Sequence, residues 1–231
     1  MRYSLICAVV AFVAGSASAV IIPAATSAGP VPAAPGDGLN GTIWLSGYQG
    51  SSLVSNLAYT LATPPSGTFR STVVDYPLAG DFVQVGDPLS SLLGADAASI
   101  VGFDPAAQNS SGHLYLFRGF LAVAQAGTVR LGVGSDDGFA FAISNIEVAS
   151  FDGERGFAYT FGDATFEAAG LYPINIFFYS NFAGESGVTF AEQFITGTIQ
   201  TVDGSRLYTV PGPAAATLGA LGGLLAARRR R

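Results

Sequence analysis

The sequence predicts an all-β protein, an antiparallel β-sandwich or jelly roll with one short helix. Short segments rich in Val, Ile, Phe, Tyr and Thr recur at regular spacing between residues 38 and 202, each bounded by Gly, Pro, Asp or Ser. Aromatic residues make up 12% of the chain, which is ample material for the core of one large domain. Within 88–102 the pattern changes, since Leu89, Leu92 and Leu93 recur at helical spacing.

The stretch from residue 128 to residue 190 organises the rest of the predicted sandwich. The segment TVRLGVGS alternates apolar residues with polar or small ones, which is the period of a strand with one buried side, and FAFAIS begins another such strand. Residues 135–138 between them, SDDG, predict a hairpin turn, because Asp and Gly tolerate the backbone angles that a tight turn needs. The turn places Asp136 and Asp137 together at one rim of the sheet.

The remaining strands are expected where apolar and β-branched residues gather between turn residues. Before the central stretch they cover 38–48, 56–63, 68–76, 81–85 and 113–123. After the turn they cover IEVASFD, GFAYTFG, DATFEAAG, 171–179, 186–190 and 195–202. The domain predicted from these strands spans residues 38–205.

The body of the protein is strongly acidic. It contains all 16 acidic residues but only five of the 10 basic ones, all arginines, so its net charge is −11. Such a surface argues against nucleic acid or anionic lipid as a partner and is compatible with cation binding. The single cysteine, Cys7, lies in the N-terminal leader, so the mature domain would depend on its core or on a bound metal rather than on disulfides.

The first 19 residues have the parts of a secretory signal peptide: a charged start, a short apolar run and a small-residue end at Ala17 and Ala19. We expect a signal-peptide helix that signal peptidase cuts after Ala19. The alternative is a buried N-terminal helix, but the run ends in small residues just where the peptidase needs them. Residues 20–37 are rich in Ala, Pro and Gly without any period, which predicts a flexible linker.

Residues 209–231 combine a Pro-containing motif, an apolar segment and a basic end. The motif consists of Val210, Pro211, Gly212, Pro213 and Ala214, and the chain closes with four arginines. The apolar segment predicts a short hydrophobic helix, although a stable transmembrane span needs about 20 residues. By the positive-inside rule the arginines would stay in the cytoplasm. The alternative is an ordinary terminal helix with a solvated basic tail.

This three-part order resembles the PEP-CTERM sorting signal of Gram-negative bacteria. In that family the membrane protease exosortase recognises and processes the signal, in organisms that make extracellular polysaccharide. The resemblance implies an exported protein that is transiently anchored in the inner membrane and then reaches the cell surface or extracellular matrix. Gly212 stands where the family's naming Glu would be.

The body of the chain, about residues 38–202, resembles the PA14 domain, a β-sandwich named after anthrax protective antigen and shared by bacterial glycosidases, toxins and yeast adhesins. The likeness is strongest at VGSDDGFAFAI and AAGLYPINIFFYSNFAGESGVTF. In the sugar-binding members, two consecutive aspartates joined by a cis peptide hold a calcium ion together with an Asn from a second loop, and the ion meets sugar hydroxyls. The resemblance implies a calcium ion held by Asp136, Asp137 and Asn181.

The aspartate pair has two interpretations. Calcium takes about six to eight oxygen ligands, and neighbouring carboxylates that repel each other favour a cation between them. Alternatively, Asp136 accepts backbone hydrogen bonds and the pair only makes a turn, while Asn181 is a polar loop residue at the end of a strand. Trp44 and Tyr48 also have two possible roles, as core residues or as a platform for a sugar.

No arrangement in the sequence points to an enzyme. The acids lie mainly in turns, as at Asp152 and Glu154, and His113 has no Cys or Asp near it in sequence to form a triad or zinc site, so we expect it to be structural. We therefore expect a secreted, surface-sorted, non-catalytic module that binds carbohydrate or exopolysaccharide or mediates adhesion. The alternative is a structural protein of the extracellular matrix, or biofilm, with no specific ligand.

Overall fold

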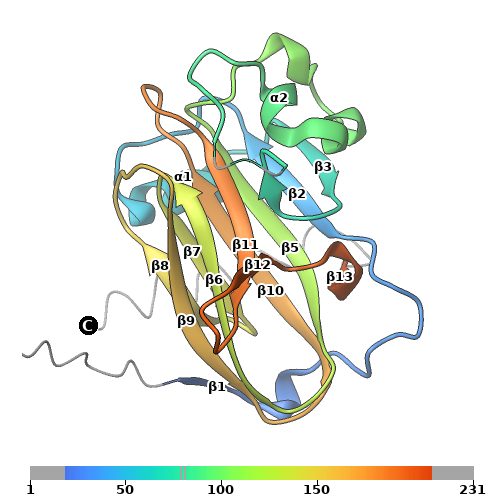
Figure 1. Ribbon diagram of the computed structural model, residues 1–231. Helices are drawn as coiled ribbons and strands as arrows, with labels where there is room; N and C mark the ends of the chain where they lie inside the picture. The colour runs from blue at the N-terminus through green and yellow to red at the C-terminus, as the bar shows by residue number, and fades with distance from the viewer. Residues whose placement is uncertain (1–18, 79, 81, 210–231) are drawn as a thin grey trace, which may run out of the picture.

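Two β-sheets pack face to face in the computed structural model, which describes residues 19–78, 80 and 82–209 (Figure 1). The all-β sandwich predicted from the sequence is confirmed. Residues 1–18 and 210–231 lie outside the described residues, and with them most of the expected signal peptide and sorting signal. None of the helices formed by the described residues is long and apolar enough to cross a membrane.

Sheet A has the strand order β1-β9-β6-β11-β12, and β4 also pairs with β11. All pairs are antiparallel except β1 with β9. In the central strand β6, Leu131 and Val133 belong to the main core, whereas Gly132 and Gly134 face aromatic side chains of β9, so the alternation predicted for this segment is confirmed. The strands of this sheet are β1 (Val20–Ile22), β4 (Asp75–Tyr76), β6 (Gly127–Asp136), β9 (Ala158–Phe166), β11 (Gly187–Gln193) and β12 (Ile199–Thr201).

Sheet B has the strand order β3-β2-β5-β10-β7-β8, and β13 pairs with β5. All of its pairs are antiparallel. The two long central strands, β5 and β10, pair over their full length, from Leu114 opposite Tyr179 to Val123 opposite Gly170. The strands of this sheet are β2 (Leu39–Trp44), β3 (Gly67–Ser71), β5 (Leu114–Val123), β7 (Phe139–Ile143), β8 (Ile146–Phe151), β10 (Gly170–Tyr179) and β13 (Leu207–Tyr208).

Aromatic side chains fill the space between the sheets. The Phe141 ring of sheet B lies 4.9 Å from the Phe190 ring of sheet A, centroid to centroid. Burying a side chain of this size stabilises the fold by about 1.5–3 kcal/mol, so the core rather than disulfides holds the described domain together. Other fully buried members of this core are Ile22, Leu39, Tyr115, Phe117, Phe139, Phe166, Tyr172 and Phe178.

A second, smaller cluster covers the outer face of sheet B. Helix α1 (Leu53–Ala62) packs its Leu53 and Leu57 against the outward side chains of β2, β5, β7 and β10. We had expected a strand over 56–63, and that prediction was wrong. The side chain of Ser52 accepts a hydrogen bond from the backbone N–H of Ser55 and so caps the start of a helix. The apolar face of this helix packs against sheet B.

The helix predicted within 88–102 is confirmed as α2 (Leu89–Leu93) followed by a 3₁₀ helix at Gly94–Ser99 (Figure 1, top). Leu89, Leu92 and Leu93 all join the main core. Further 3₁₀ turns lie at Ala24–Thr26, Pro105–Ala107 and Gly204–Arg206.

Two other expectations about strands differ from the structure. Residues 82–85 form no strand, and Val83 makes only an isolated bridge to Ser186. The segments GFAYTFG and DATFEAAG form one strand, β9, rather than two, because β6 pairs with it without interruption from residue 158 to residue 166.

Part of the linker expected at residues 20–37 is ordered strand. Strand β1 pairs in parallel with the end of β9, and Ile22 is fully buried in the main core. The next turn is tied to β10, since Ala28 donates to the carbonyl oxygen of Leu171 and Leu171 donates to that of Gly29. The sequence signal for this strand was weak, because the apolar run is only three residues long, Val20 to Ile22, and Ala- and Pro-rich residues follow it.

Candidate functional site

The aspartate pair lies where the chain crosses from one sheet to the other. Asp136 ends β6 in sheet A and pairs with Gly187 of β11. The N–H of Asp137 donates to the carbonyl oxygen of Tyr179 at the end of β10 in sheet B, over 3.1 Å. The peptide bond between the two aspartates is cis. Strand β7 begins two residues later, at Phe139.

The hairpin turn predicted at residues 135–138 was therefore wrong. Strands β6 and β7 belong to different sheets and do not pair with each other. All five residues of β7 are buried. The strand pairs with β10 and β8 along its two edges, while Phe139 and Phe141 face the main core and Ala140 faces the α1 cluster. A strand buried on both sides is not specified by alternation, which is why the sequence pattern did not reveal the crossing.

Asp137 is held by backbone donors and is only 2% exposed. Its Oδ2 accepts from the N–H of Asn181 over 2.7 Å, and its Oδ1 accepts from the N–H of Arg155 over 3.1 Å. The Ser135 hydroxyl donates to its carbonyl oxygen over 2.5 Å. Burial raises the pKa of the Asp137 carboxyl, while the N–H groups of Asn181 and Arg155 counteract this by stabilising the charged form.

Asp136 has less compensation for its charge. Burial raises the pKa of this carboxyl to about 7, and the negative charges of Asp137 and Glu185 add to the rise. The side chain is only 4% exposed. Arg155 and the N–H of Phe157 lower the pKa, but they offset only part of the increase. Asp136 is therefore a buried carboxylate whose ionised form lacks a sufficient counter-charge.

Asn181 lies beside Asp137, as the resemblance implied. Its Nδ2 is 3.5 Å from Asp137 Oδ1, whereas its Oδ1 accepts from the N–H groups of Ala183 and Gly184 over 2.9 and 2.7 Å. In this arrangement the amide nitrogen, not the oxygen, faces the carboxylate. The structure thus brings the three predicted residues together, but the Asn181 oxygen is engaged by its own loop.

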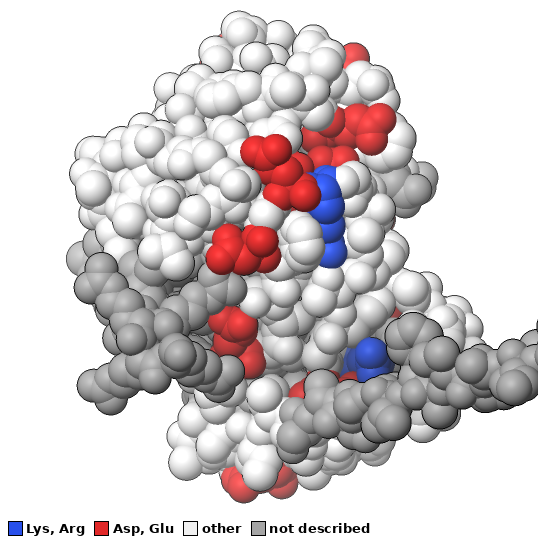
Figure 2. All heavy atoms as spheres, turned by 90° about the vertical axis from the view of Figure 1, so that its left-hand side faces the viewer, with Lys and Arg blue, Asp and Glu red and all other residues white. Residues whose placement is uncertain are grey.

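A cavity of about 390 Å³ opens beside the pair. Its lining combines four acids with a single cation: Asp136, Asp137, Glu154, Arg155, Gly156, Asn181, Gly184 and Glu185. Figure 2 shows that acidic side chains outnumber basic ones on the face that it presents. Among the described residues, no group of three or more His, Cys, Asp or Glu side chains is arranged to hold a metal ion. Any metal here would therefore need the amide, backbone, water or ligand oxygens as well.

Arg155 does not neutralise the aspartates by direct pairing. Its guanidinium donates to the hydroxyls of Ser135 and Thr160 over 2.9 and 2.8 Å and lies 4.2 Å from the centroid of the Phe151 ring. None of the ion pairs formed within the described chain involves it. Neutral partners thus bind the guanidinium. The negative charge of the two aspartates therefore remains available to a bound cation.

Tyr179 ties the loops of the site to sheet B. Its hydroxyl donates to the carbonyl oxygen of Ser51 over 2.6 Å and accepts from the N–H of Gly153 over 3.0 Å. Gly138 lies against the ring, where an added Cβ would be 2.3 Å from ring atoms, so only glycine fits there. Tyr48 stands next to Tyr179 with ring centroids 5.8 Å apart and donates to the Glu154 carboxylate.

Trp44 and His113 have other places in the fold. The Trp44 indole N–H donates to the carbonyl oxygen of Thr63 over 2.8 Å, and the ring belongs to the α1 cluster rather than to the aspartate cavity. His113 Nδ1 accepts from the N–H of Ser46 over 3.0 Å, and Nε2 lies 2.8 Å from the carbonyl oxygen of Asn109. Burial lowers the pKa of His113, so the ring is a neutral link between two loops.

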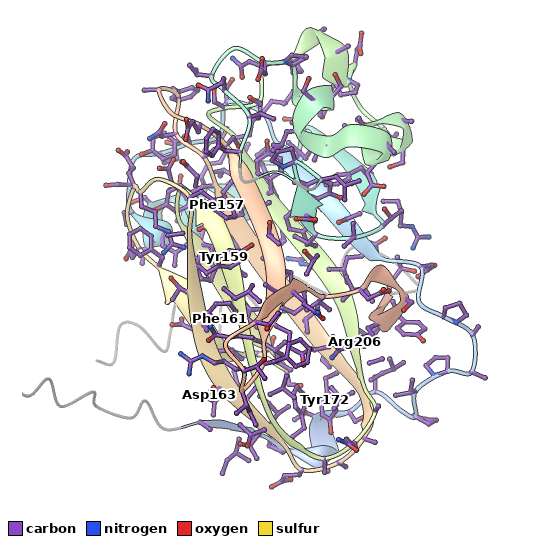
Figure 3. All side chains as sticks on the ribbon, in the orientation of Figure 1. Phe157, Tyr159, Phe161, Asp163, Tyr172 and Arg206 are labelled. Atoms are coloured by element: carbon purple, nitrogen blue, oxygen red, sulfur yellow. The ribbon has the colours of Figure 1, made fainter. Side chains whose placement is uncertain are left out.

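Sequence reasoning missed a row of aromatic rings that begins beside Asp136. Phe157 lies directly before β9, and Tyr159 and Phe161 follow along this strand (Figure 3), on the face opposite the core residues Ala164 and Phe166. Their centroids are 5.4 and 5.7 Å apart, and Tyr159 is 36% exposed. The rings lie over β6 where Gly132 and Gly134 provide no side chain. The sequence did contain a signal for this row: Gly132 and Gly134 alternate in one strand, and Tyr159 and Phe161 alternate in the strand that pairs with it.

Comparison with known proteins supports the fold. No protein-family model matches the chain, and no curated protein matches it by sequence. The structure is similar to that of the PA14 domain of the antifreeze protein MpAFP, with a TM-score of 0.65 and 19% identity over 80% of this chain and 97% of that one. It is also similar to a PA14 sugar-binding domain from an RTX adhesin, with a TM-score of 0.61 and 24% identity over 76% and 99%.

A third similar structure is the A domain of epithelial adhesin 6 from Candida glabrata, solved in complex with Galβ1-3GlcNAc. It has a TM-score of 0.55 and 12% identity over 81% of this chain and 93% of that one. These likenesses, together with the two-sheet topology, confirm the PA14-like β-sandwich predicted from the sequence.

Proposed function

We propose that the protein is a non-catalytic carbohydrate-binding or adhesion module whose sugar is held through a calcium ion at Asp136 and Asp137. The observation that carries the proposal is the buried Asp136 carboxylate, which lacks a sufficient counter-charge at the mouth of an acidic cavity. Two similar structures, a sugar-binding domain from an RTX adhesin and a yeast adhesin with a bound disaccharide, support a glycan as the ligand class.

The donor set fits calcium. Carboxylate and amide oxygens are the hard ligands that calcium prefers, and no sulfur or imidazole is among the residues that line the cavity. A bound calcium ion would neutralise the carboxylates and accept sugar hydroxyls at its remaining positions. The N–H groups of Asn181 and Arg155 already orient the Asp137 carboxylate and partly compensate its charge. The less compensated negative charge, on Asp136, would attract the ion more strongly.

Asn181 joins the ligand set only if its side-chain amide turns over. Its Oδ1 must then leave the N–H groups of Ala183 and Gly184, which it now satisfies. Calcium binding should therefore shift the amide proton resonances of these two residues. An NMR titration with calcium that leaves both resonances in place would remove Asn181 from the ligand set.

A saccharide chain that extends away from the calcium ion could pack along the aromatic row on β9. The backbone N–H of Phe157 itself contacts Asp136, and the row continues through Tyr159 to Phe161. The apolar faces of sugar rings pack against aromatic rings, which provide contact area at little cost in side-chain entropy. We therefore favour a glycan with several residues over a single terminal sugar at this site.

The proposal is tested by glycan-array binding in calcium and in chelator. Wild-type protein should bind one group of glycans in calcium only, and the double variant Asp136→Asn, Asp137→Asn should bind none. The matched control is Asp104→Asn with Asp203→Asn, which removes the same number of negative charges at two exposed helix N-caps. Asn is also a good N-cap residue, so this control should fold and bind as the wild type does. Equal binding by wild type and site variant would contradict the proposal.

The competing function is a structural matrix protein with no specific ligand. The observation that favours it is that Asn181 Oδ1 and both oxygens of Asp137 have partners within the chain. A folded protein that binds no glycan at any calcium concentration would support this alternative.

Export and sorting complete the proposed function. Signal peptidase would remove residues 1–19, and exosortase would process the signal that begins at Val210, so that the domain reaches the surface of a Gram-negative cell. The tripartite leader and the tripartite end of the sequence support this part of the proposal.

A further inference from the structure

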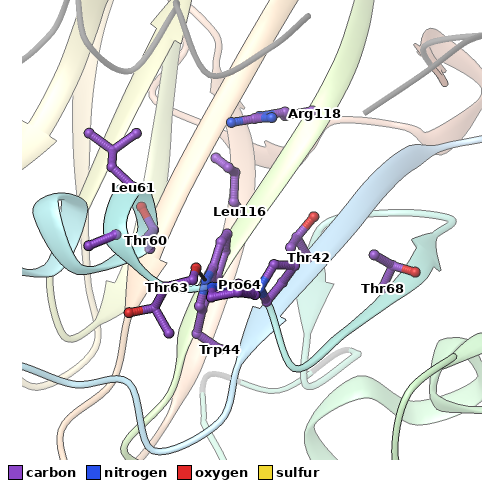
Figure 4. A pocket seen from close by; sticks show the side chains of 11 residues that line it. Thr42, Trp44, Thr60, Leu61, Thr63, Pro64, Thr68, Leu116 and Arg118 are labelled. Carbon is purple, nitrogen blue, oxygen red and sulfur yellow. Dashed lines mark hydrogen bonds between the residues drawn. The ribbon is translucent and has the colours of Figure 1, made fainter. Parts of the chain in front are cut away.

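A second cavity, of about 380 Å³, lies on the outer face of sheet B beside the C-terminal end of α1. Figure 4 shows Trp44 and Pro64 at one end of it, Arg118 across the other and Leu116 between them. None of its lining residues also lines the aspartate cavity. The full lining is Thr42, Trp44, Thr60, Leu61, Ala62, Thr63, Pro64, Pro65, Thr68, Leu116 and Arg118.

Arg118 is the only charged residue of this lining, and its charge is not compensated. Its Nε atom is buried without a hydrogen-bond partner, and none of the ion pairs within the described residues includes its guanidinium. Burial lowers the pKa of the side chain, because it removes water from the charged form. Because a guanidinium stays protonated, a half-buried arginine whose Nε has no hydrogen-bond partner favours an anion that completes its hydrogen bonds.

The other walls are suited to a small ring with hydroxyl groups. The indole of Trp44 is fixed by its hydrogen bond to Thr63, and Leu61, Leu116 and the two prolines supply apolar surface. The hydroxyl of Thr60 donates to the carbonyl oxygen of Leu57 over 2.8 Å. The hydroxyls of Thr42, Thr63 and Thr68 make no hydrogen bond to other residues in the part of the chain that the structure describes, so they can serve a ligand.

We propose that this cavity binds one carboxylated sugar residue, a hexuronate, whose carboxylate pairs with Arg118. An arginine fork matches a carboxylate with two parallel hydrogen bonds, and the three threonine hydroxyls match the sugar hydroxyls. The volume suits a ligand of this size, since small-molecule pockets measure about 300–1,000 Å³. The site needs no calcium and does not depend on the aspartate pair.

Trp44 provides a direct test, because it is the only tryptophan of the protein and lines the cavity. We would titrate the protein with methyl β-glucuronide in chelator and follow the tryptophan fluorescence. We expect a saturable change, with at least tenfold weaker responses to the neutral methyl β-glucoside and to sodium acetate. Equal responses to the two sugars would overturn the role of Arg118, and an equal response to acetate would overturn the sugar as ligand.

Substitutions of Arg118 test whether this residue causes the preference for glucuronide. Arg118→Met keeps the aliphatic length and removes the charge, so the preference for glucuronide over glucoside should disappear while the melting temperature is kept or raised. Arg118→Lys keeps the charge without the fork and should retain only part of the preference. Arg130→Met removes an exposed arginine that pairs with Asp163 and should bind as the wild type does. Wild-type preference in both Arg118 variants would overturn the proposal.

The double variant Asp136→Asn, Asp137→Asn separates this inference from the proposed calcium site. It should lose calcium-dependent glycan binding but keep the fluorescence response to methyl β-glucuronide. Loss of both responses in a variant that melts cooperatively would show that the two cavities are not independent and would overturn the assignment.

Discussion

At the scale of single residues, the two adjacent aspartates have different chemical roles. Both Asp137 oxygens accept backbone hydrogen bonds, which orient this carboxylate and stabilise its charge. Asp136 is equally buried but is held at a pKa of about 7 by burial and by the negative charges around it. A cation would therefore be oriented mainly by Asp137 and attracted mainly by the uncompensated charge of Asp136.

The raised pKa of Asp136 predicts how stability depends on pH in chelator. An unfolded aspartate titrates near 3.8, so between pH 4 and pH 7 the folded state binds more protons, and stability falls as the pH rises. From pH 5 to pH 8 the loss should be about 2–3 kcal/mol in the free energy of unfolding, measured with urea. Asp136→Asn should remove most of this slope. An unchanged slope in the variant would contradict the assignment of the titrating group.

At the scale of elements, Tyr179 connects three pieces of chain. It ends β10, and its hydroxyl reaches the loops that carry Ser51 and Gly153. Gly153 directly precedes Glu154 and Arg155, which line the aspartate cavity. The Tyr179 hydroxyl therefore helps to position this cavity wall, together with the contacts that Glu154 and Arg155 make themselves.

Tyr179→Phe should lower the free energy of unfolding by about 1–3 kcal/mol, because it leaves the part-buried N–H of Gly153 and the carbonyl oxygen of Ser51 without this partner. The control is Tyr208→Phe, which removes a hydroxyl bonded to the carbonyl oxygen of Ala34 at an exposed position. Urea unfolding of both variants measures the difference. An equal effect of the two substitutions would count against the proposed connection.

Helix α1 is held to sheet B by its apolar face, and Leu57, which is 2% exposed, lies on that face. Leu57→Ala should cost about 2–4 kcal/mol because it opens a cavity between the helix and the sheet. Leu61→Ala, at a residue that is 38% exposed, should cost less than half as much. Equal losses, measured by denaturant unfolding, would mean that the helix is not packed as described.

The sandwich was predictable because alternation is explicit in strands such as β6, whose Leu131 and Val133 face the core. The position of Asn181 beside Asp137 followed only from the resemblance, since the two are 44 residues apart in the chain. Helix α1 was not predictable from apolar spacing alone, because Tyr59 and Thr60 also suit a strand. Arg118 gave no signal either, because its missing partner is a property of the folded cavity.

For the whole molecule, export and sorting would act on segments at the two ends of the sequence. If the end of the chain is a processed signal, the mature protein should lack Arg228 to Arg231, and it should begin at Val20. Intact-mass measurement of protein extracted from the cell surface tests both points. A mature form that retains the four arginines would contradict processing by exosortase and leave the domain's fold unaffected.

If calcium binds the folded domain at Asp136 and Asp137, it should stabilise this domain against thermal unfolding. A ligand at a hundredfold excess over its dissociation constant adds about 2.7 kcal/mol of stability. We predict a melting temperature several degrees higher in calcium than in chelator for the wild type and for the Asp104→Asn, Asp203→Asn control. The Asp136→Asn, Asp137→Asn variant should melt at the same temperature in both. A wild-type melting temperature that does not change between calcium and chelator would contradict the claim.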